Sequence, residues 1–156
     1  MMARYDKAME ERVWQRVQGN QAETESPRPP EGNLQALILG EWAAASAYLM
    51  LSRQVGAKEA AVLQRMFREE QAHAAILKGM YTLITGQKCV VQTPQPAKEP
   101  LETALRKCYG AELRSVAAYE ARIADPEYGH VFARLAAQER EHCALVLELL
   151  GGMQRK

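Results

Sequence analysis

Apolar side chains recur at helical spacing along most of this chain. Near its beginning they come every four residues, which predicts a short amphipathic helix over residues 3–18 with an apolar stripe of Tyr5, Met9, Val13 and Val17. Residues 19–32 are mostly polar and contain three prolines, so they are predicted to form a linker. The chain therefore divides into an N-terminal part, residues 1–32, and a helical domain, residues 33–152.

Four longer helical segments follow the linker, and local signals mark their ends. Their predicted spans are 33–54, 58–85, 100–124 and 126–150. Asn33 is a favourable capping residue at the first start, and Gly86 follows the end of the second helix. Asp125-Pro126-Glu127 indicates a helix start, because a capping Asp is followed by Pro and by an acid in the first turn. Gly151-Gly152 is predicted to end the last helix.

The loop lengths predict how these helices are connected. Short turns join the first helix to the second and the third to the fourth, so each pair is expected to form an antiparallel hairpin. The middle connection has about 13 residues and spans roughly 40 Å when extended at about 3.3 Å per residue. It can therefore run the length of a helix of about 25 residues. The predicted fold is all-α, a ferritin-like antiparallel four-helix bundle with one long crossover, plus the short N-terminal helix.

Composition narrows the functional classes. The chain is 47% apolar and 25% charged with a net charge of +1, so neither nucleic acid nor an anionic membrane surface is expected as a partner. Its three cysteines are odd in number and form no Cys-x-x-Cys motif, which disfavours a disulfide framework or a zinc ribbon. The N-terminus opens no apolar run typical of a signal peptide. We therefore expect a cytoplasmic protein.

One segment, Leu34 to Leu51, is apolar enough to pass for a short membrane span. It lies at the short end of the spanning range. Glu41 near its middle would cost about 2.5–3.5 kcal/mol in a bilayer. A buried helix of the bundle is the better interpretation, and no membrane association is expected.

A repeated pattern of acids, histidines and tyrosines distinguishes the four helices. In the first and third helices, a Glu is followed seven residues later by a Tyr; the pairs are Glu41 with Tyr48 and Glu112 with Tyr119. The second and fourth helices carry Glu-x-x-His, as Glu70 with His73 and Glu139 with His142. This spacing places carboxylate and imidazole on one helix face.

All four glutamates lie at similar heights in the predicted bundle. Each is about 13 to 15 residues from the turn of its hairpin, and at about 1.5 Å per residue the two acids of a pair are level within an ångström or two. Four carboxylates and two imidazoles in an apolar core need compensating positive charge. Two divalent cations would supply it, and mixed oxygen and nitrogen ligands suit iron or manganese, with zinc also open. The tyrosine hydroxyls are placed to hydrogen-bond ligand carboxylates.

Other polar residues have simpler interpretations. Isolated acids on helices are usually solvated, which is our expectation for Glu69, Glu102, Glu120, Glu141 and Glu148. His130 has no Glu three residues before it and is expected at the surface. Cys143 follows a predicted ligand but points about 100° away from it, so it is expected to pack in the core.

At these residues the sequence resembles the ferritin-like di-iron carboxylate superfamily, and rubrerythrins most of all. The resemblance spans about residues 34 to 150 and is carried by Glu41, Glu70-x-x-His73, Glu112 and Glu139-x-x-His142. It implies two iron ions that react with peroxide or dioxygen. By this likeness Glu70 and Glu139 bridge the metals, while Glu41 with His73 and Glu112 with His142 complete one ion each.

The sequence departs from rubrerythrins at two points. Those proteins usually have a second glutamate one turn after the first in the third helix, where this chain has Ser115, so efficient peroxide reduction is in question. They also usually carry a rubredoxin domain with Cys-x-x-Cys pairs, which this sequence lacks. Electrons would then come from an external donor protein.

Three functions remain open from the sequence. The leading hypothesis is a di-iron oxidoreductase of oxidative-stress defence that reacts Fe(II) with peroxide or dioxygen. The second is a ferroxidase that handles or stores iron. The third is a non-catalytic, metal-stabilised bundle that acts as a binding module through its N-terminal helix. We expect a homodimer, with the stripe of that helix packing on its own bundle or on a second subunit.

Overall fold

The computed structural model describes residues 34–92 and 95–155. Within these residues it contains four α-helices and no strands: α2 (Leu34–Ser52), α3 (Ala57–Thr85), α4 (Leu101–Glu120) and α5 (Gly129–Met153). This confirms the predicted all-α four-helix bundle. The predicted helix over residues 3–18, the linker and Asn33 lie outside the described residues.

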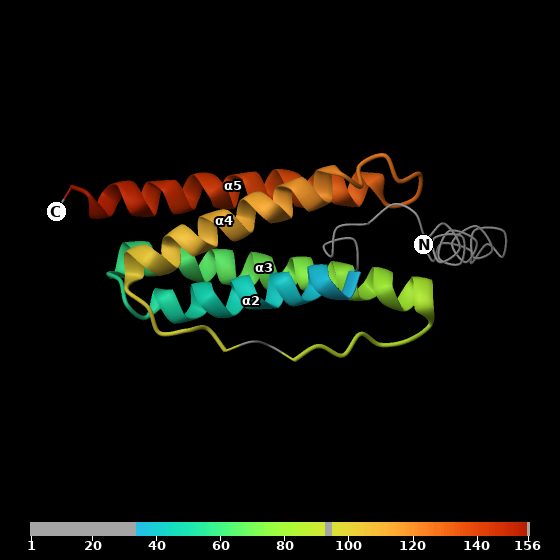
Figure 1. Cartoon of the computed structure of the whole chain (residues 1–156), viewed down its shortest axis with the longest axis horizontal. Coiled ribbons are helices and arrows are strands. Elements are labelled where there is room, and N and C mark those ends of the chain that lie inside the picture. The colour runs from blue at the N-terminus through green and yellow to red at the C-terminus, as the bar shows by residue number, and fades with distance from the viewer. Residues whose placement is uncertain (1–33, 93–94, 156) are drawn as a thin grey trace.

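The helices form two antiparallel hairpins joined by a long crossover (Figure 1). The hairpins are α2 with α3 and α4 with α5, and they pack so that α2 lies against α4 and α3 against α5. The connection between α3 and α4 returns along the full length of the bundle (Figure 1). As a result α4 runs in the same direction as α3, whereas α2 and α4 are antiparallel neighbours. This is the topology that the loop lengths predicted.

Backbone chemistry explains the end of α3. Gly86 has φ 71°, in the left-handed region that glycine enters without steric cost. Its N–H donates to the carbonyl of Thr82 at 2.8 Å, which satisfies one of the acceptors left open at a helix end. The predicted end before Gly86 is confirmed.

The connection between α4 and α5 differs from the prediction. α4 ends at Glu120 and not near residue 124, because a tight turn with i+3 bonds, such as Ile123 N–H to Glu120 O at 3.3 Å, follows it. Asp125 closes this turn, because its Oδ1 accepts the N–H groups of Glu127 and Tyr128, both at 2.8 Å, but it is not the N-cap of the helix, which is Tyr128. The α-helix itself begins only at Gly129, where a Cβ would lie 2.1 Å from the carbonyl oxygen of Ile123.

At its other end, α5 continues through Gly151 and Gly152 to Met153. The predicted stop at the two glycines was wrong. Met153 packs on the apolar cluster at this end of the bundle, so tertiary contact extends the helix past residues of low helix propensity.

The apolar core is divided into two clusters with a polar layer between them. One cluster consists of Leu37, Ile38, Leu77, Met80, Ala118, Tyr119, Phe132, Leu135 and Ala136. The other consists of Tyr48, Leu51, Leu63, Met66, Leu105, Cys108 and Val146. On every helix, the buried glutamate lies between the residues that it contributes to the two clusters. The bundle therefore holds the polar groups at mid-height, away from either end.

Among the described helices, α2 alone is long and apolar enough to cross a membrane. In the bundle it packs against α3 and α4 and buries Glu41 and Tyr48 between them. The buried acid thus faces protein groups, as expected for a core helix.

Candidate metal centre

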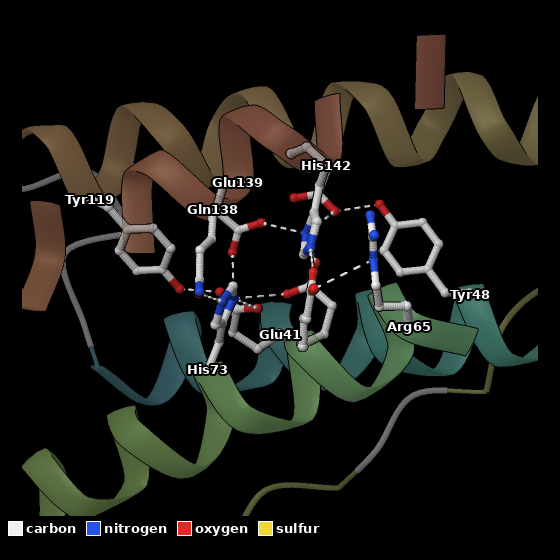
Figure 2. Close-up of polar contacts among 11 residues, drawn as sticks. Glu41, Tyr48, Arg65, His73, Tyr119, Gln138, Glu139 and His142 are labelled. Atoms are coloured by element: carbon white, nitrogen blue, oxygen red, sulfur yellow. Dashed lines mark hydrogen bonds and ion pairs between the residues drawn. The ribbon is translucent and has the colours of Figure 1, made fainter. Parts of the chain in front are cut away.

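All six predicted metal ligands lie together in the polar layer. One glutamate comes from each of α2 and α4, and a Glu-x-x-His pair from each of α3 and α5; the residues are Glu41, Glu70, His73, Glu112, Glu139 and His142. None is more than 3% exposed. The helical spacing of three residues orients each histidine and its preceding glutamate toward the same side of the helix, and Figure 2 shows this for Glu139 and His142.

The six side chains form two overlapping groups of possible metal ligands. The first group is Glu41, Glu70, His73 and Glu139; the second is Glu70, Glu112, Glu139 and His142. Within each group, one ligand atom per residue lies within 4.8 Å of the others. Glu70 and Glu139 belong to both groups, so the two possible sites share these two carboxylates.

Both histidines direct Nδ1 into the centre. Nδ1 of His73 lies 3.0 Å from Glu139 Oε1 and 3.2 Å from Glu70 Oε2. Nδ1 of His142 lies 2.8 Å from Glu70 Oε1 and 3.2 Å from Glu139 Oε2. The two imidazole rings stack at 5.8 Å between centroids. The geometry is therefore nearly symmetric about the two shared carboxylates.

Each predicted tyrosine contacts a carboxylate across the bundle (Figure 2). The Tyr48 hydroxyl donates a hydrogen bond to Glu112, and the Tyr119 hydroxyl donates one to Glu41. The tyrosine of each helix therefore bonds to the glutamate of the other helix and not to that of its own. This follows because α2 and α4 run antiparallel, so their Glu-x6-Tyr patterns overlap in opposite directions. These bonds hold the two unshared carboxylates in position.

Two residues outside the predicted set contact the outer nitrogens of the histidines. Nε2 of His142 donates to Glu69 Oε2 at 2.6 Å, and Nε2 of His73 donates to the amide oxygen of Gln138. The expectation that Glu69 is merely solvated was wrong, although its side chain is 33% exposed and also lies 3.6 Å from Arg65. Each residue directly precedes a shared glutamate but reaches the histidine of the opposite helix.

These outer contacts determine which nitrogen is available to a metal. With Nε2–H donated outward, a neutral imidazole presents the Nδ1 lone pair to the centre. The acceptors of the two Nε2–H groups differ: His142 donates to the carboxylate of Glu69, whereas His73 donates to the amide of Gln138. A carboxylate acceptor makes the imidazole a stronger electron donor, so the two halves of the centre are chemically unequal.

Burial and charge produce strongly shifted pKa values in this layer. Burial raises the pKa of Glu70 well above its ordinary range and that of Glu139 to about 8. Burial also opposes ionisation of Glu112, but hydrogen bonds from Glu139 and His142 outweigh it and lower that pKa to about 2. The pKa of Glu41 is lowered in the same way, because hydrogen bonds with Glu70 and His73 outweigh the effect of burial.

Both histidines have raised pKa values. Burial by itself would lower the pKa of His73, but hydrogen bonds to Glu139, Glu41 and Glu70 raise it to about 12. The pKa of His142 is raised well above its usual range by the corresponding bonds. Without metal, the negative charges of Glu41 and Glu112 are balanced by the positive charges of the two imidazolium groups. Protons therefore neutralise this layer when no other cation does.

The residues fit a pair of divalent cations. Glu70 is fully buried, and its Oε2 forms no well-aligned hydrogen bond among the described residues, although His73 Nδ1 lies 3.2 Å away; such poor satisfaction is costly for a buried carboxylate. Four carboxylates and two neutral imidazoles carry the charge that two divalent ions neutralise. Nitrogen and oxygen donors without a thiolate suit iron, manganese or zinc.

A cavity of about 570 Å³ adjoins the centre on one side. It lies between α2, α4 and residues 95–99 of the crossover, with Glu41, Glu70 and Glu112 at its inner end, and neither histidine is among its lining residues. Ser115, at the position where rubrerythrins usually carry another glutamate, lines the same cavity. The carboxylates of the centre, and not its histidines, therefore border this cavity.

The remaining expectations concern residues away from the centre. His130 is exposed and Cys143 is buried, both as expected. Cys89, Cys108 and Cys143 are free thiols, in agreement with the absence of a disulfide framework. Glu120, Glu141 and Glu148 are exposed, and Glu102 is partly exposed.

Comparison with known proteins found no match to a protein-family model, to a curated protein or to a solved structure. The likeness to di-iron proteins is therefore carried by the ligand set and the bundle topology. What the structure supports directly is a four-helix bundle with a buried glutamate and histidine cluster able to hold metal ions.

Proposed function

We propose that this chain is a di-iron oxidoreductase that reacts with peroxide or dioxygen and is re-reduced by an external electron-donor protein. The observation that carries the proposal is the pair of overlapping ligand groups that share Glu70 and Glu139. A structural metal site needs one closed shell of ligands. Two ions held by shared carboxylates, with a cavity leading to them, suit a reaction that takes two electrons at once.

Each residue has a defined task in this proposal. Glu70 and Glu139 hold both ions, while Glu41 with His73 and Glu112 with His142 complete the separate ligand shells. Tyr48 and Tyr119 keep the unshared carboxylates in position by hydrogen bonds. Bound iron supplies the electrons for reduction of the oxidant. The apolar clusters above and below the layer exclude water from its two ends along the bundle.

The first test is the metal content of the purified protein. We expect about two iron ions per chain after anaerobic addition of Fe(II), as in other bundles with this ligand set. Glu70→Ala and Glu139→Ala should lose both ions because each removes a shared ligand. Glu102→Ala is the matched control, since that carboxylate pairs with Arg106 on the exposed face of α4. A ratio near one in the wild type would refute a two-metal centre.

The second test separates an oxidoreductase from a bundle that only binds metal. Fe(II)-loaded protein is mixed in a stopped-flow instrument with peroxide or with dioxygen, and near-ultraviolet absorbance is followed as iron is oxidised. We expect a rise with at least one oxidant. No rise in protein with both ions confirmed bound would overturn the oxidoreductase proposal and leave the metal site intact. A cytoplasmic homodimer remains part of the proposal, and sedimentation analysis tests the dimer.

A further inference from the structure

The cavity beside the metal centre is much larger than the oxidants require. Its volume is about 570 Å³, in the range of sites for organic ligands. A water molecule occupies about 30 Å³ of liquid volume, and dioxygen or peroxide, with two non-hydrogen atoms, needs about twice that. At roughly 30 Å³ per non-hydrogen atom, the cavity has room for at most about twenty such atoms.

The cavity exists because small side chains face each other across α2 and α4. Gly40, Ala44 and Ala47 line it from α2, and Ala111 and Ser115 line it from α4. α2 lacks the polar stripe that a helix exposed to water normally carries, and apolar residues occur all around it. Apart from Glu41 and Tyr48 beside the metal centre, its wall in the cavity is therefore apolar, which favours an apolar ligand over water.

Two basic side chains lie at the cavity wall, and among the described residues only one of them forms an ion pair. Lys107 and Arg114 line the cavity from α4. Lys107 is already neutralised by Glu99, with Nζ 2.7 Å from Oε2. Arg114 forms no ion pair with another residue in the part of the chain that the structure describes. An exposed guanidinium beside an apolar cavity is complementary to an anionic group, preferentially a carboxylate.

We propose that this cavity binds an apolar organic molecule of up to about twenty non-hydrogen atoms, with a carboxylate at its outer end near Arg114 and its hydrocarbon part against the carboxylate side of the metal centre. Only the role of this molecule as a substrate rests on the proposed function. Binding itself depends on the cavity and on the charge at its wall. The two can therefore be tested separately.

The test is a binding titration of the metal-loaded, full-length protein with linear carboxylates from butanoate to octanoate, and with 1-octanol for comparison. Each added methylene buried in the cavity should tighten binding about fourfold. Octanoate should bind more tightly than 1-octanol by up to about fivefold, as expected for an ion pair with an exposed guanidinium. Affinity independent of chain length would overturn the proposal.

Two pairs of variants locate the site. Ala44→Phe places a ring inside the cavity and should weaken octanoate binding about tenfold or more by filling its volume. Ala61→Phe is the control, because Ala61 is exposed on α3 and is not among the cavity residues. Arg114→Gln should remove the preference for octanoate over octanol, whereas Arg106→Gln, on the same helix outside the cavity, should preserve it.

The outcomes separate this inference from the proposed function. Unchanged octanoate preference in Arg114→Gln would mean that the carboxylate binds the metals directly, and would overturn the proposed orientation. Equal effects of Ala44→Phe and Ala61→Phe would place the ligand elsewhere. Metal content is measured for each variant, so loss of binding with both ions retained reports on the cavity. Octanoate binding without any redox activity would uphold the cavity and refute the oxidoreductase.

Discussion

Metal loading of this centre should release protons, and their number follows from the pKa shifts. In protein stripped of metal at pH 7, both histidines carry a second proton because their pKa values are raised, to about 12 for His73. Glu139, with a pKa of about 8, is mostly protonated, and the pKa of Glu70 is also raised well above its ordinary range. Glu41 and Glu112 are ionised because their pKa values are lowered.

Two divalent ions must displace these protons to reach their ligands. One proton leaves each histidine and one leaves each shared carboxyl group, so about four protons should be released per two metal ions. Exposed ligand sets with ordinary pKa values would release almost none at pH 7, since carboxylates are already ionised and histidines mostly neutral. The predicted value is therefore a property of the buried layer.

Isothermal titration calorimetry measures this number directly. Zinc is added at pH 7 in buffers of different ionisation enthalpy, and the slope of the observed heat against that enthalpy counts the protons released. His73→Ala should lower the count by about one, whereas exposed His130→Ala should not change it. Release of fewer than about two protons would refute the charge assignment above. Because metal binding releases protons, the metal affinity should also fall as the pH falls, since protons compete for the same four groups.

Three further predictions concern single residues. Glu69→Gln should weaken binding of the ion at His142 about 10- to 100-fold, measured by stepwise zinc titration, because the carboxylate that accepts from Nε2–H is lost; equal weakening of both ions would contradict the assigned asymmetry. Tyr119→Phe removes a donor to a buried carboxylate and should lower the free energy of unfolding of the metal-stripped protein by about 1–3 kcal/mol in urea; no change would mean that another donor takes over. Gly129→Ala should destabilise the protein, since the added Cβ would meet a backbone oxygen at 2.1 Å, whereas Gly79→Ala, with nothing within 4 Å, should stabilise it by about 0.5–1 kcal/mol; equal effects would show that the turn before α5 can relax.

Local patterns in the sequence were sufficient to predict the helices and most of the candidate centre. A carboxylate and an imidazole three residues apart share a face of any α-helix, whatever surrounds it. The distances of Glu41 and Glu70 from one turn, and of Glu112 and Glu139 from the other, then place the four acids at one level. The long middle connection likewise permits few arrangements of the two hairpins. These features depend on helix geometry and chain length, which are readable from sequence.

Other features depend on contacts between helices that are distant in sequence. Glu69 is like any surface acid until α3 and α5 are packed, and only then does it reach His142. The same packing brings Gln138 to His73 and sends Tyr48 to Glu112 rather than to Glu41. α5 continues through two glycines because Met153, beyond them, packs against an apolar cluster of the bundle. Helical periodicity determined which faces turn inward, whereas the alignment of those faces in three dimensions decided which side chains meet and where space remains between them.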